Sequence, residues 1–181
     1  HTLPTYVADL VDAGLGGTIL FRRNIESLEQ LIALNSEILG RGKASLLGVD
    51  EEGGRVRRLR GITSDLPAMA QLGACDDPDL SYRMGALLGR ELAALGFSID
   101  FAPILDVHTN ADNPVIGDRA FATTADQVIR TALPFARGLQ SMGVAACGKH
   151  FPGHGDTDTD SHLALPILDH DAQRMADVEL A

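Results

Sequence analysis

VIRTALPFARGLQSMGVAACGKH, residues 128–150, joins a helical pattern to a strand pattern in one stretch. Its apolar residues first recur at the 3.6-residue period of an amphipathic helix, ending at Met142. Gly143 follows, at the position where a left-handed residue commonly ends a helix. The apolar run 144–148 then predicts a buried strand, and the polar pair Lys149-His150 comes directly after it. The stretch therefore predicts a helix, a strand and a polar site in chain order.

The same alternation recurs along the chain. Apolar runs predict strands at residues 17–21, 45–49, 98–105 and 144–148. Apolar stripes at helical spacing predict helices over residues 28–39, 80–95 and 128–142, and Ser27 is the expected cap of the first. Glycines at the expected left-handed helix ends are Gly14, Gly40, Gly96 and Gly143. Strands that alternate with helices predict an α/β fold with a parallel sheet and right-handed crossovers.

Polar clusters at the strand ends favour a barrel over a doubly wound sheet. They lie at residues 50–52, 106–108 and 149–150, each directly after an apolar run. A (β/α)₈ TIM barrel gathers such side chains around its mouth, and no G-x-G-x-x-G turn follows the first strand. Four units in 181 residues, against eight in about 250, predict a partial barrel. We therefore expect residues 1–181 to form one partial TIM-barrel domain that lacks strands at both its N- and C-terminal ends.

Composition excludes several classes of protein. The 15 Lys+Arg against 25 Asp+Glu give a net charge of −10, which argues against binding to nucleic acid or to an anionic membrane surface. No apolar run reaches the ~18 residues of a membrane-spanning helix. Two cysteines without a disulfide pattern mildly favour a reducing compartment, so a cytoplasmic location is the expectation.

The densest set of reactive side chains lies at residues 149–162, with one Lys, three His and three Asp directly after the last predicted strand. Two chemistries fit. His150, His154 and His162 could bind a divalent metal together with an Asp. Alternatively, Asp160 could orient His162 as a general acid/base. Lys149 argues against the metal because its ammonium would oppose a bound cation, but the spacing alone leaves both chemistries open.

Four segments in order resemble glycoside hydrolase family 3, in its bacterial β-N-acetylglucosaminidase branch. They are residues 49–56 (VDEEGGRV), 101–107 (FAPILDV), 113–121 (NPVIGDRAF) and 149–155 (KHFPGHG), the last followed by Asp160-Ser161-His162 and Pro166. The resemblance implies a barrel, retention of configuration and a glycosyl-enzyme intermediate, with no metal and no cofactor. It implies that His162 is the acid/base and Asp160 its partner. The side chains implied to bind the terminal sugar are Asp50, Arg58, Arg119, Lys149 and His150.

The resemblance also sets the expected activity, an exo-β-N-acetylglucosaminidase that acts on small muropeptide fragments of peptidoglycan. A two-membrane bacterium would hold such an enzyme in the cytoplasm, and a single-membrane bacterium would export it. The family's nucleophile is an Asp on a later strand, beyond Ala181, so the fragment alone is expected to be inactive. Asp106 and Asp156 are the obvious substitutes within the chain, but Asp106 matches a different family position and Asp156 lies in a loop that its glycines predict to be mobile. The alternatives are a β-glucosidase-like member of the same family, a metal-dependent barrel hydrolase, and a sugar-binding module without catalysis.

Overall fold

The computed structural model of the chain describes residues 2–41, 46–161 and 163–181. Its centre is a parallel sheet of four strands in the order β1-β2-β5-β6, formed by β1 (Gly17–Leu20), β2 (Leu46–Val49), β5 (Ile99–Asp100) and β6 (Ala145–Ala146). A two-stranded antiparallel ribbon, β3 (Glu51–Gly53) with β4 (Val56–Arg57), follows β2 directly. Neighbouring strands in this parallel sheet thus follow chain order, as they do in a barrel wall.

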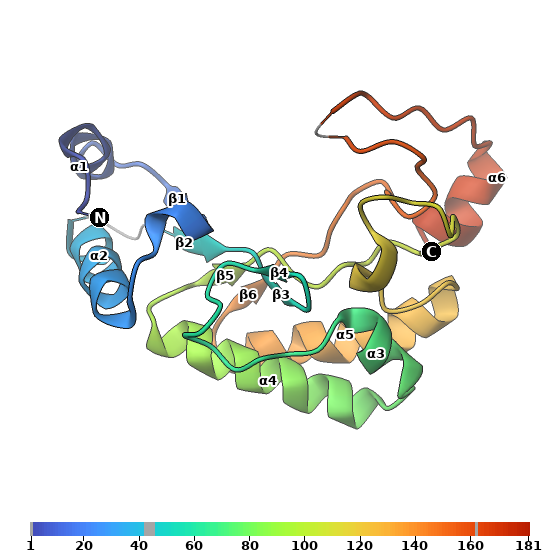
Figure 1. The fold of residues 1–181 in the computed structure, drawn as a ribbon, viewed down its shortest axis with the longest axis horizontal. Helices are drawn as coiled ribbons and strands as arrows, with labels where there is room; N and C mark the ends of the chain where they lie inside the picture. Colours follow the sequence, from blue (N-terminus) through green and yellow to red (C-terminus); the bar gives the residue numbers. More distant parts are fainter. Residues whose placement is uncertain (1, 42–45, 162) are drawn as a thin grey trace.

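Helices precede, connect and follow the parallel strands. Their bounds are α1 (Thr5–Asp12), α2 (Leu28–Arg41), α3 (Met69–Ala74), α4 (Pro78–Ala94), α5 (Ala125–Ser141) and the short α6 (Ala172–Arg174). Single turns of 3₁₀ helix form η1 (Arg22–Asn24) and η2 (Gly117–Arg119), and a π-helical turn forms η3 (Met175–Glu179). In Figure 1, α4 and α5 lie side by side along one face of the sheet, while α1 and α2 stand beside β1 and β2.

The expected helix ends are largely confirmed. The hydroxyl of Ser27 accepts the N–H of Gln30 at the start of α2. Gly14, Gly96 and Gly143 have φ of 98°, 86° and 85°, which are left-handed values that glycine adopts without strain. The expectation for Gly40 is wrong, because α2 runs on through Gly40 to Arg41. An isolated glycine inside a helical stripe costs helix stability but does not end the helix.

The strands are shorter than their apolar runs. Only Ile99–Asp100 of the predicted 98–105 strand and Ala145–Ala146 of the predicted 144–148 strand are regular, and Ser45 lies outside the described residues. Pro103 has no N–H to donate to a neighbouring strand, and the ladder is interrupted there. Pairing resumes at an isolated bridge between Ile104 and Lys149. After β5 and β6, irregular backbone therefore begins before the polar residues 106–108 and 149–150.

The core lies between the sheet and its helices. Its most buried members include Leu31 and Ile38 of α2, Leu88 and Leu92 of α4, Phe135 and Leu139 of α5, and Leu47 and Val49 of β2. These side chains fix the strands in place, so the residues at the strand ends start from a rigid base. Among the described residues, no helix is long and apolar enough to cross a membrane. Both cysteines are free thiols.

Candidate active site

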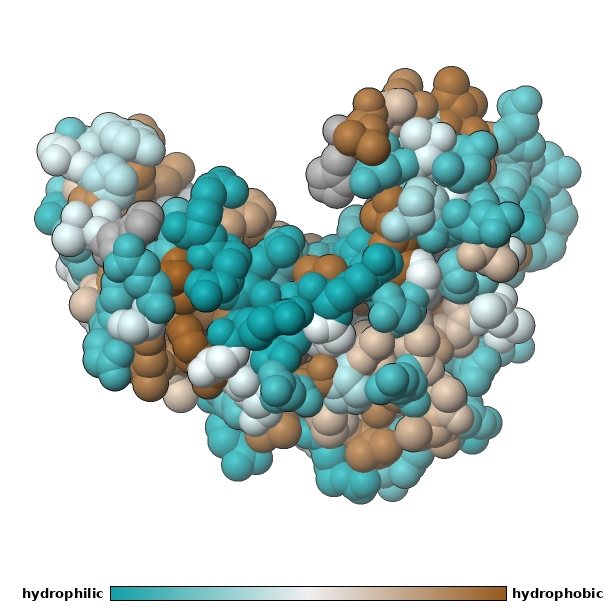
Figure 2. All heavy atoms as spheres, in the orientation of Figure 1, coloured by the Kyte–Doolittle hydropathy of each residue, from teal (hydrophilic) through white to brown (hydrophobic). Residues whose placement is uncertain are grey.

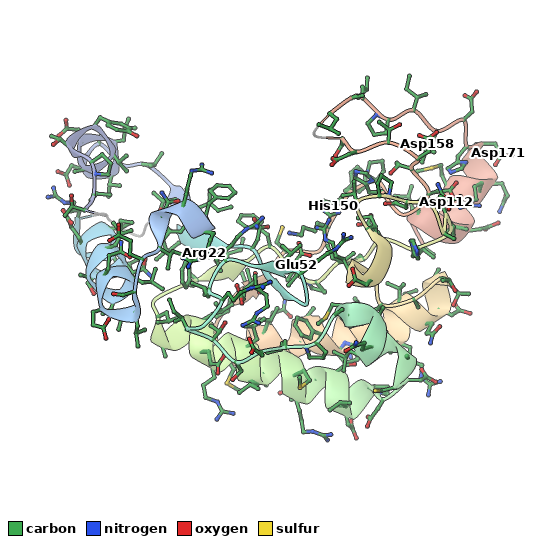
Figure 3. The ribbon with its side chains drawn as sticks, in the orientation of Figure 1. Arg22, Glu52, Asp112, His150, Asp158 and Asp171 are labelled. Atoms are coloured by element: carbon green, nitrogen blue, oxygen red, sulfur yellow. The ribbon has the colours of Figure 1, made fainter. Side chains whose placement is uncertain are left out.

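Charged side chains from two strand ends meet at the carboxyl edge of the sheet. Asp50 follows β2, and Lys149 follows β6 one residue beyond the end of its apolar run. The Nζ atom of Lys149 lies 2.7 Å from Oδ1 of Asp50 and 2.6 Å from Oε1 of Glu52. Figure 3 shows Glu52 near the centre of the molecule, with His150 between it and the loop that leads to α6. The ammonium that follows β6 thus joins two carboxylates that follow β2, across the end of the intervening strand β5.

Glu52 also holds a second cation. Its carboxylate accepts two hydrogen bonds from Arg119 of η2, both of 2.9 Å, to Nε and Nη2. The Glu52 side chain is 2% exposed and that of Arg119 is 11% exposed. Burial lowers the pKa of Arg119, but the hydrogen bonds and attraction of Glu52 outweigh burial and leave that pKa raised. The guanidinium therefore stays charged and is held in a fixed bidentate geometry.

Arg58 is the third cation of this charged group and pairs with Asp50. Its Nη2 atom lies 3.5 Å from Oδ2 of Asp50. Its Nε atom is buried and makes no hydrogen bond to any residue that the structure describes. Asp50 thus bridges Arg58 and Lys149, while the Arg58 guanidinium keeps a donor for another partner. The group combines two carboxylates with three cations.

Glu51 points to the opposite side of this loop. Its carboxylate accepts hydrogen bonds from Arg57, from the N–H of Leu59 and from the hydroxyl of Thr63. Burial raises the pKa of Glu51 despite these donors. Because alternate residues of an extended chain face opposite sides, Asp50 and Glu52 share the face on which Lys149 lies. Glu51 instead anchors the turn that carries Arg58.

A second pair, Asp106 and His150, lies beside the charged group. Oδ2 of Asp106 is 2.7 Å from Nδ1 of His150, and Oδ1 accepts the backbone N–H of His154 at 2.7 Å. The Asp106 side chain has no exposed surface. A cavity of about 170 Å³ opens here, lined by Asp106, Lys149 and His150 among others. Both oxygens of Asp106 are engaged, so it is unsuited to be a nucleophile.

Asp156, the other candidate substitute for the nucleophile, is engaged as well. Its Oδ1 atom accepts the hydroxyl of Thr109 at 2.7 Å, and its Oδ2 atom lies 3.0 Å from Nε2 of His170. Asp156 therefore ties the loop to neighbouring segments rather than facing the charged group around Lys149.

The predicted acid/base dyad is only partly described. His162 lies outside the described residues. Asp160 is described, and its backbone carbonyl accepts the N–H groups of Leu163 and Ala164. The assignment of His162 as acid/base with Asp160 as its partner therefore stays a prediction.

The alternative metal site draws no support from the geometry of His154. Its Nδ1 atom lies 2.6 Å from the hydroxyl of Thr157, and its Nε2 atom lies 3.0 Å from the hydroxyl of Ser161. No group of three or more His, Cys, Asp or Glu side chains within residues 2–41, 46–161 and 163–181 is arranged to hold a metal ion. The chemistry that the described residues offer is hydrogen bonding to a polar ligand.

Apart from Arg58, the side chains that gather here come from the segments that carry the family resemblance. A family model described as "Glycosyl hydrolase family 3 N terminal domain" matches residues 4–181. The chain belongs to glycosyl hydrolase family 3. A family 3 relative named Beta-hexosaminidase, from Neisseria meningitidis serogroup C (strain 053442), is 41% identical over 181 residues. The match covers 95% of this chain and 49% of that relative, so the chain spans about half the length of the curated relatives it matches.

Solved structures of family 3 proteins share the fold. A glycoside hydrolase family 3 beta-N-acetylglucosaminidase from Paenibacillus sp. str. FPU-7 superposes with a TM-score of 0.89 at 42% identity, over 95% of this chain and 34% of that one. NagZ from Neisseria gonorrhoeae, in complex with N-trifluoroacetyl-D-glucosamine, gives 0.91 at 38% identity, over 99% and 56%. The expected family and the expected partial TIM barrel are thereby confirmed, and the doubly wound alternative is wrong.

Four of the five predicted sugar-binding residues form one connected group, and the fifth lies next to it. Asp50, Arg58, Arg119 and Lys149 are joined by ion pairs through Asp50 and Glu52. His150 follows Lys149 in the chain and is held by Asp106. Sequence reasoning missed Glu52, although the alternation of residues 50–52 after a buried strand is a signal that could have found it. It named Asp106 only as a substitute nucleophile that matches a different family position, and it did not find that Asp106 is the partner of His150.

Proposed function

We propose that the protein is a retaining exo-β-N-acetylglucosaminidase that removes terminal β-linked N-acetylglucosamine. The observation that carries the proposal is the ion-paired group of Asp50, Glu52, Arg119 and Lys149 at the mouth of a family 3 barrel. The names of the relatives support it, since they are a beta-hexosaminidase and a beta-N-acetylglucosaminidase. The ligand of the NagZ structure, an N-acylated glucosamine, supports the same sugar.

The charged group suits a sugar because it is preorganised. Hydroxyls of the terminal residue would accept from Lys149 and Arg58 and donate to Asp50, with Arg119 and His150 at the sides. Ion pairs hold these side chains before the ligand arrives, so little ordering cost remains on binding. The chain has no Trp and only 4% aromatic residues, which favours recognition of a terminal sugar by hydrogen bonds over stacking along a glycan.

The proposed reaction has two steps. A carboxylate nucleophile attacks the anomeric carbon while His162, oriented by Asp160, donates a proton to the leaving oxygen. The same imidazole then removes a proton from water, which releases the sugar with its configuration retained. We place the nucleophile on a later barrel strand, outside residues 1–181, and propose that these residues are part of the N-terminal barrel domain. The proposed substrates are small muropeptide fragments, and the proposed location is the cytoplasm.

The test is hydrolysis of 4-nitrophenyl N-acetyl-β-D-glucosaminide by the full-length protein and its His162→Ala variant. We expect chelator-insensitive activity that falls sharply in the variant, and falls less with a 2,4-dinitrophenyl leaving group because that group needs no acid assistance. Loss of activity in chelator would instead indicate the metal-dependent hydrolase. Preference for 4-nitrophenyl β-D-glucoside would indicate the β-glucosidase-like alternative, and no turnover of any glycoside would indicate a binding module.

A further inference from the structure

The carboxylate of Asp106 holds three donors that belong to one short segment. Oδ2 pairs with Nδ1 of His150 at 2.7 Å. Oδ1 accepts the backbone N–H of His150 at 3.3 Å and that of His154 at 2.7 Å. The side chain has no exposed surface, so water does not compete for these contacts. One buried carboxylate thus fixes both the side chain of His150, which lies beside the charged group, and the start of the loop at residues 150–154.

Backbone pairing brings the two segments into this register. Lys149 donates its N–H to the carbonyl of Pro103, and Leu105 donates its N–H to the carbonyl of Lys149 at 2.7 Å. Asp106 and His150 each come one residue after these paired positions, at adjoining strand ends. The contact between them therefore rests on backbone hydrogen bonds that extend the pairing of β5 with β6 beyond the regular strands.

We propose that Asp106 is a positioning residue that fixes the tautomer of His150, so that the neutral ring presents Nε2 to the terminal sugar as a hydrogen-bond acceptor. A carboxylate can only accept at Nδ1, so the proton of the neutral ring must lie on Nδ1. No residue that the structure describes makes a hydrogen bond to Nε2, and His150 lines the cavity beside Lys149. This inference rests on the proposed function and adds how one of its side chains recognises the substrate.

The tautomer of His150 matters because it places a hydrogen-bond acceptor, Nε2, next to a hydrogen-bond donor, the ammonium of Lys149. Lys149 can only donate, whereas Nε2 of this tautomer can only accept. A sugar hydroxyl between them could accept from the ammonium and donate to the imidazole, which uses both of its hydrogen-bonding capacities. With the other tautomer, both neighbours would be donors and the hydroxyl proton would lose its partner. Asp106 thus determines which atom in this part of the site accepts a hydrogen bond from the sugar.

Asp106→Asn tests the tautomer specifically because backbone N–H groups fix the orientation of the new side-chain amide. The N–H groups of His150 and His154 need an acceptor, so the amide oxygen must take the place of Oδ1. The amide nitrogen then faces Nδ1 of His150 and donates to it. The variant therefore keeps the two hydrogen bonds from the backbone N–H groups of His150 and His154. It reverses only the direction of the hydrogen bond at Nδ1, which moves the ring proton from Nδ1 to Nε2.

The first experiment observes the tautomer directly. Long-range ¹H–¹⁵N spectra of histidine-labelled full-length protein, with the His150 signals assigned by their loss in His150→Asn, report which ring nitrogen carries the proton. At a pH where the ring is neutral, we expect Nδ1–H in the wild type and Nε2–H in Asp106→Asn. An Nε2–H tautomer in the wild type would overturn the proposal, and this reading depends neither on the variant's folding nor on activity.

The second experiment is a kinetic cycle with 4-nitrophenyl N-acetyl-β-D-glucosaminide. Asp106→Asn should lower kcat/KM about 10- to 100-fold, the size expected for a lost sugar hydrogen bond. The double variant Asp106→Asn/His150→Asn should be no worse than His150→Asn alone, because Asp106 acts through His150. Additive losses would overturn the proposal. A wild type that hydrolyses no glycoside would refute the proposed function, while the spectra would still decide the tautomer.

Discussion

Glu52 stands between the two cations that the proposed site depends on most. It receives two hydrogen bonds from Arg119 and lies 2.6 Å from Lys149. Glu52→Gln removes the charge at nearly constant shape and leaves two partly buried cations with too little compensation. We expect a loss of about 2–4 kcal/mol in the free energy of unfolding and about a 10- to 100-fold fall in kcat/KM. Urea unfolding and hydrolysis rates check the two values.

The matched control for this change is Glu37→Gln. Glu37 of α2 lies 3.3 Å from Arg41, and both side chains are about 40% exposed. Water already solvates this surface pair, so the same substitution there should change unfolding by less than about 0.5 kcal/mol. Equal effects at Glu37 and Glu52 would contradict the assignment of Glu52 as the centre of the charged group.

Asp100 of β5 accepts the backbone N–H of Glu51, next to the charged group. It gives the folding stability a pH dependence whose sign can be stated. Burial raises the pKa of Asp100 well above 3.8, even though Oδ1 accepts the N–H of Glu51. Its Oδ2 is buried and has no hydrogen-bond partner in the described part of the chain. Between pH 3.8 and the raised pKa, the folded state binds more protons than the unfolded state at this group. Its contribution to stability is therefore lost as pH rises through that window.

Asp100→Asn should abolish this contribution. The amide oxygen can keep the hydrogen bond from Glu51, and the cost of burying the amide nitrogen does not vary with pH. Each unit by which burial raises the pKa costs the wild type about 1.4 kcal/mol at high pH, so the variant should gain relative stability as pH rises. Urea unfolding at pH 4 to 8 measures the difference. A difference that is constant over this range would show that Asp100 ionises normally in the fold.

The sequence predicted which residue types form the site and that they lie at strand ends, but it did not predict how they pair. Lys149, Asp50 and Arg119 were picked out by resemblance. Asp50 and Lys149 lie together because parallel strands end at one edge, and Arg119 of η2 joins them through Glu52. The alternation of residues 50–52 could have pointed to Glu52, which shares a face with Asp50. The pairing of Asp106 with His150 could not be found in this way, because it depends on the backbone register beyond Pro103, which local patterns do not determine.

At the scale of elements, α4 and α5 pack unusually closely through glycines. A Cβ atom on Gly138 of α5 would overlap the carbonyl oxygen of Tyr82 and lie 2.6 Å from the backbone nitrogen of Ala86, both in α4. Gly85 of α4 faces the backbone of Phe135 in the same way. Because these neighbours are backbone atoms, Gly138→Ala must push the helices apart. We expect a loss of about 2 kcal/mol or more in unfolding free energy.

Gly40→Ala is the control for that prediction. Gly40 also lies inside a helix, but a Cβ atom there would meet nothing within 4 Å. The substitution should therefore stabilise the protein by about 0.5–1 kcal/mol, because alanine is the better helix former. Thermal or urea unfolding compares the two variants, and a Gly138→Ala protein as stable as the wild type would mean that α4 and α5 are not closely packed.

The helices and the order of the parallel strands followed from sequence better than their ends did. Apolar stripes of eleven residues or more predicted α2, α4 and α5, since only a long helix repeats at that spacing. The short runs around 98–105 and 144–148 overstated the strands, because an apolar run marks burial and not ladder pairing. Gly40 and Gly143 look alike in sequence, yet only Gly143 has a left-handed backbone, while Gly40 lies inside α2.

On the scale of the whole molecule, polar groups gather in one hollow. Figure 2 shows it between the α1–α2 end and the loop before α6, with hydrophilic side chains across its floor. The chain carries a net charge of −10, yet three cations, Arg58, Arg119 and Lys149, converge near Asp50. These cations are paired with Asp50 and Glu52, and Asp106 lies close enough to Arg119 to interact with its charge. The proposed nucleophile from a later strand would add a further carboxylate beside these cations.

Residues 1–181 by themselves should lack the nucleophile of the proposed reaction. The two candidate carboxylates within them are engaged, Asp106 by His150 and His154, and Asp156 by Thr109 and His170. A polypeptide of these 181 residues should therefore hydrolyse 4-nitrophenyl N-acetyl-β-D-glucosaminide at least about 10³-fold more slowly than the full-length protein. Parallel assays, with folding checked by circular dichroism, measure the ratio. Comparable rates in a folded 181-residue chain would place the nucleophile inside it, and Asp106→Asn and Asp156→Asn would then identify which carboxylate it is.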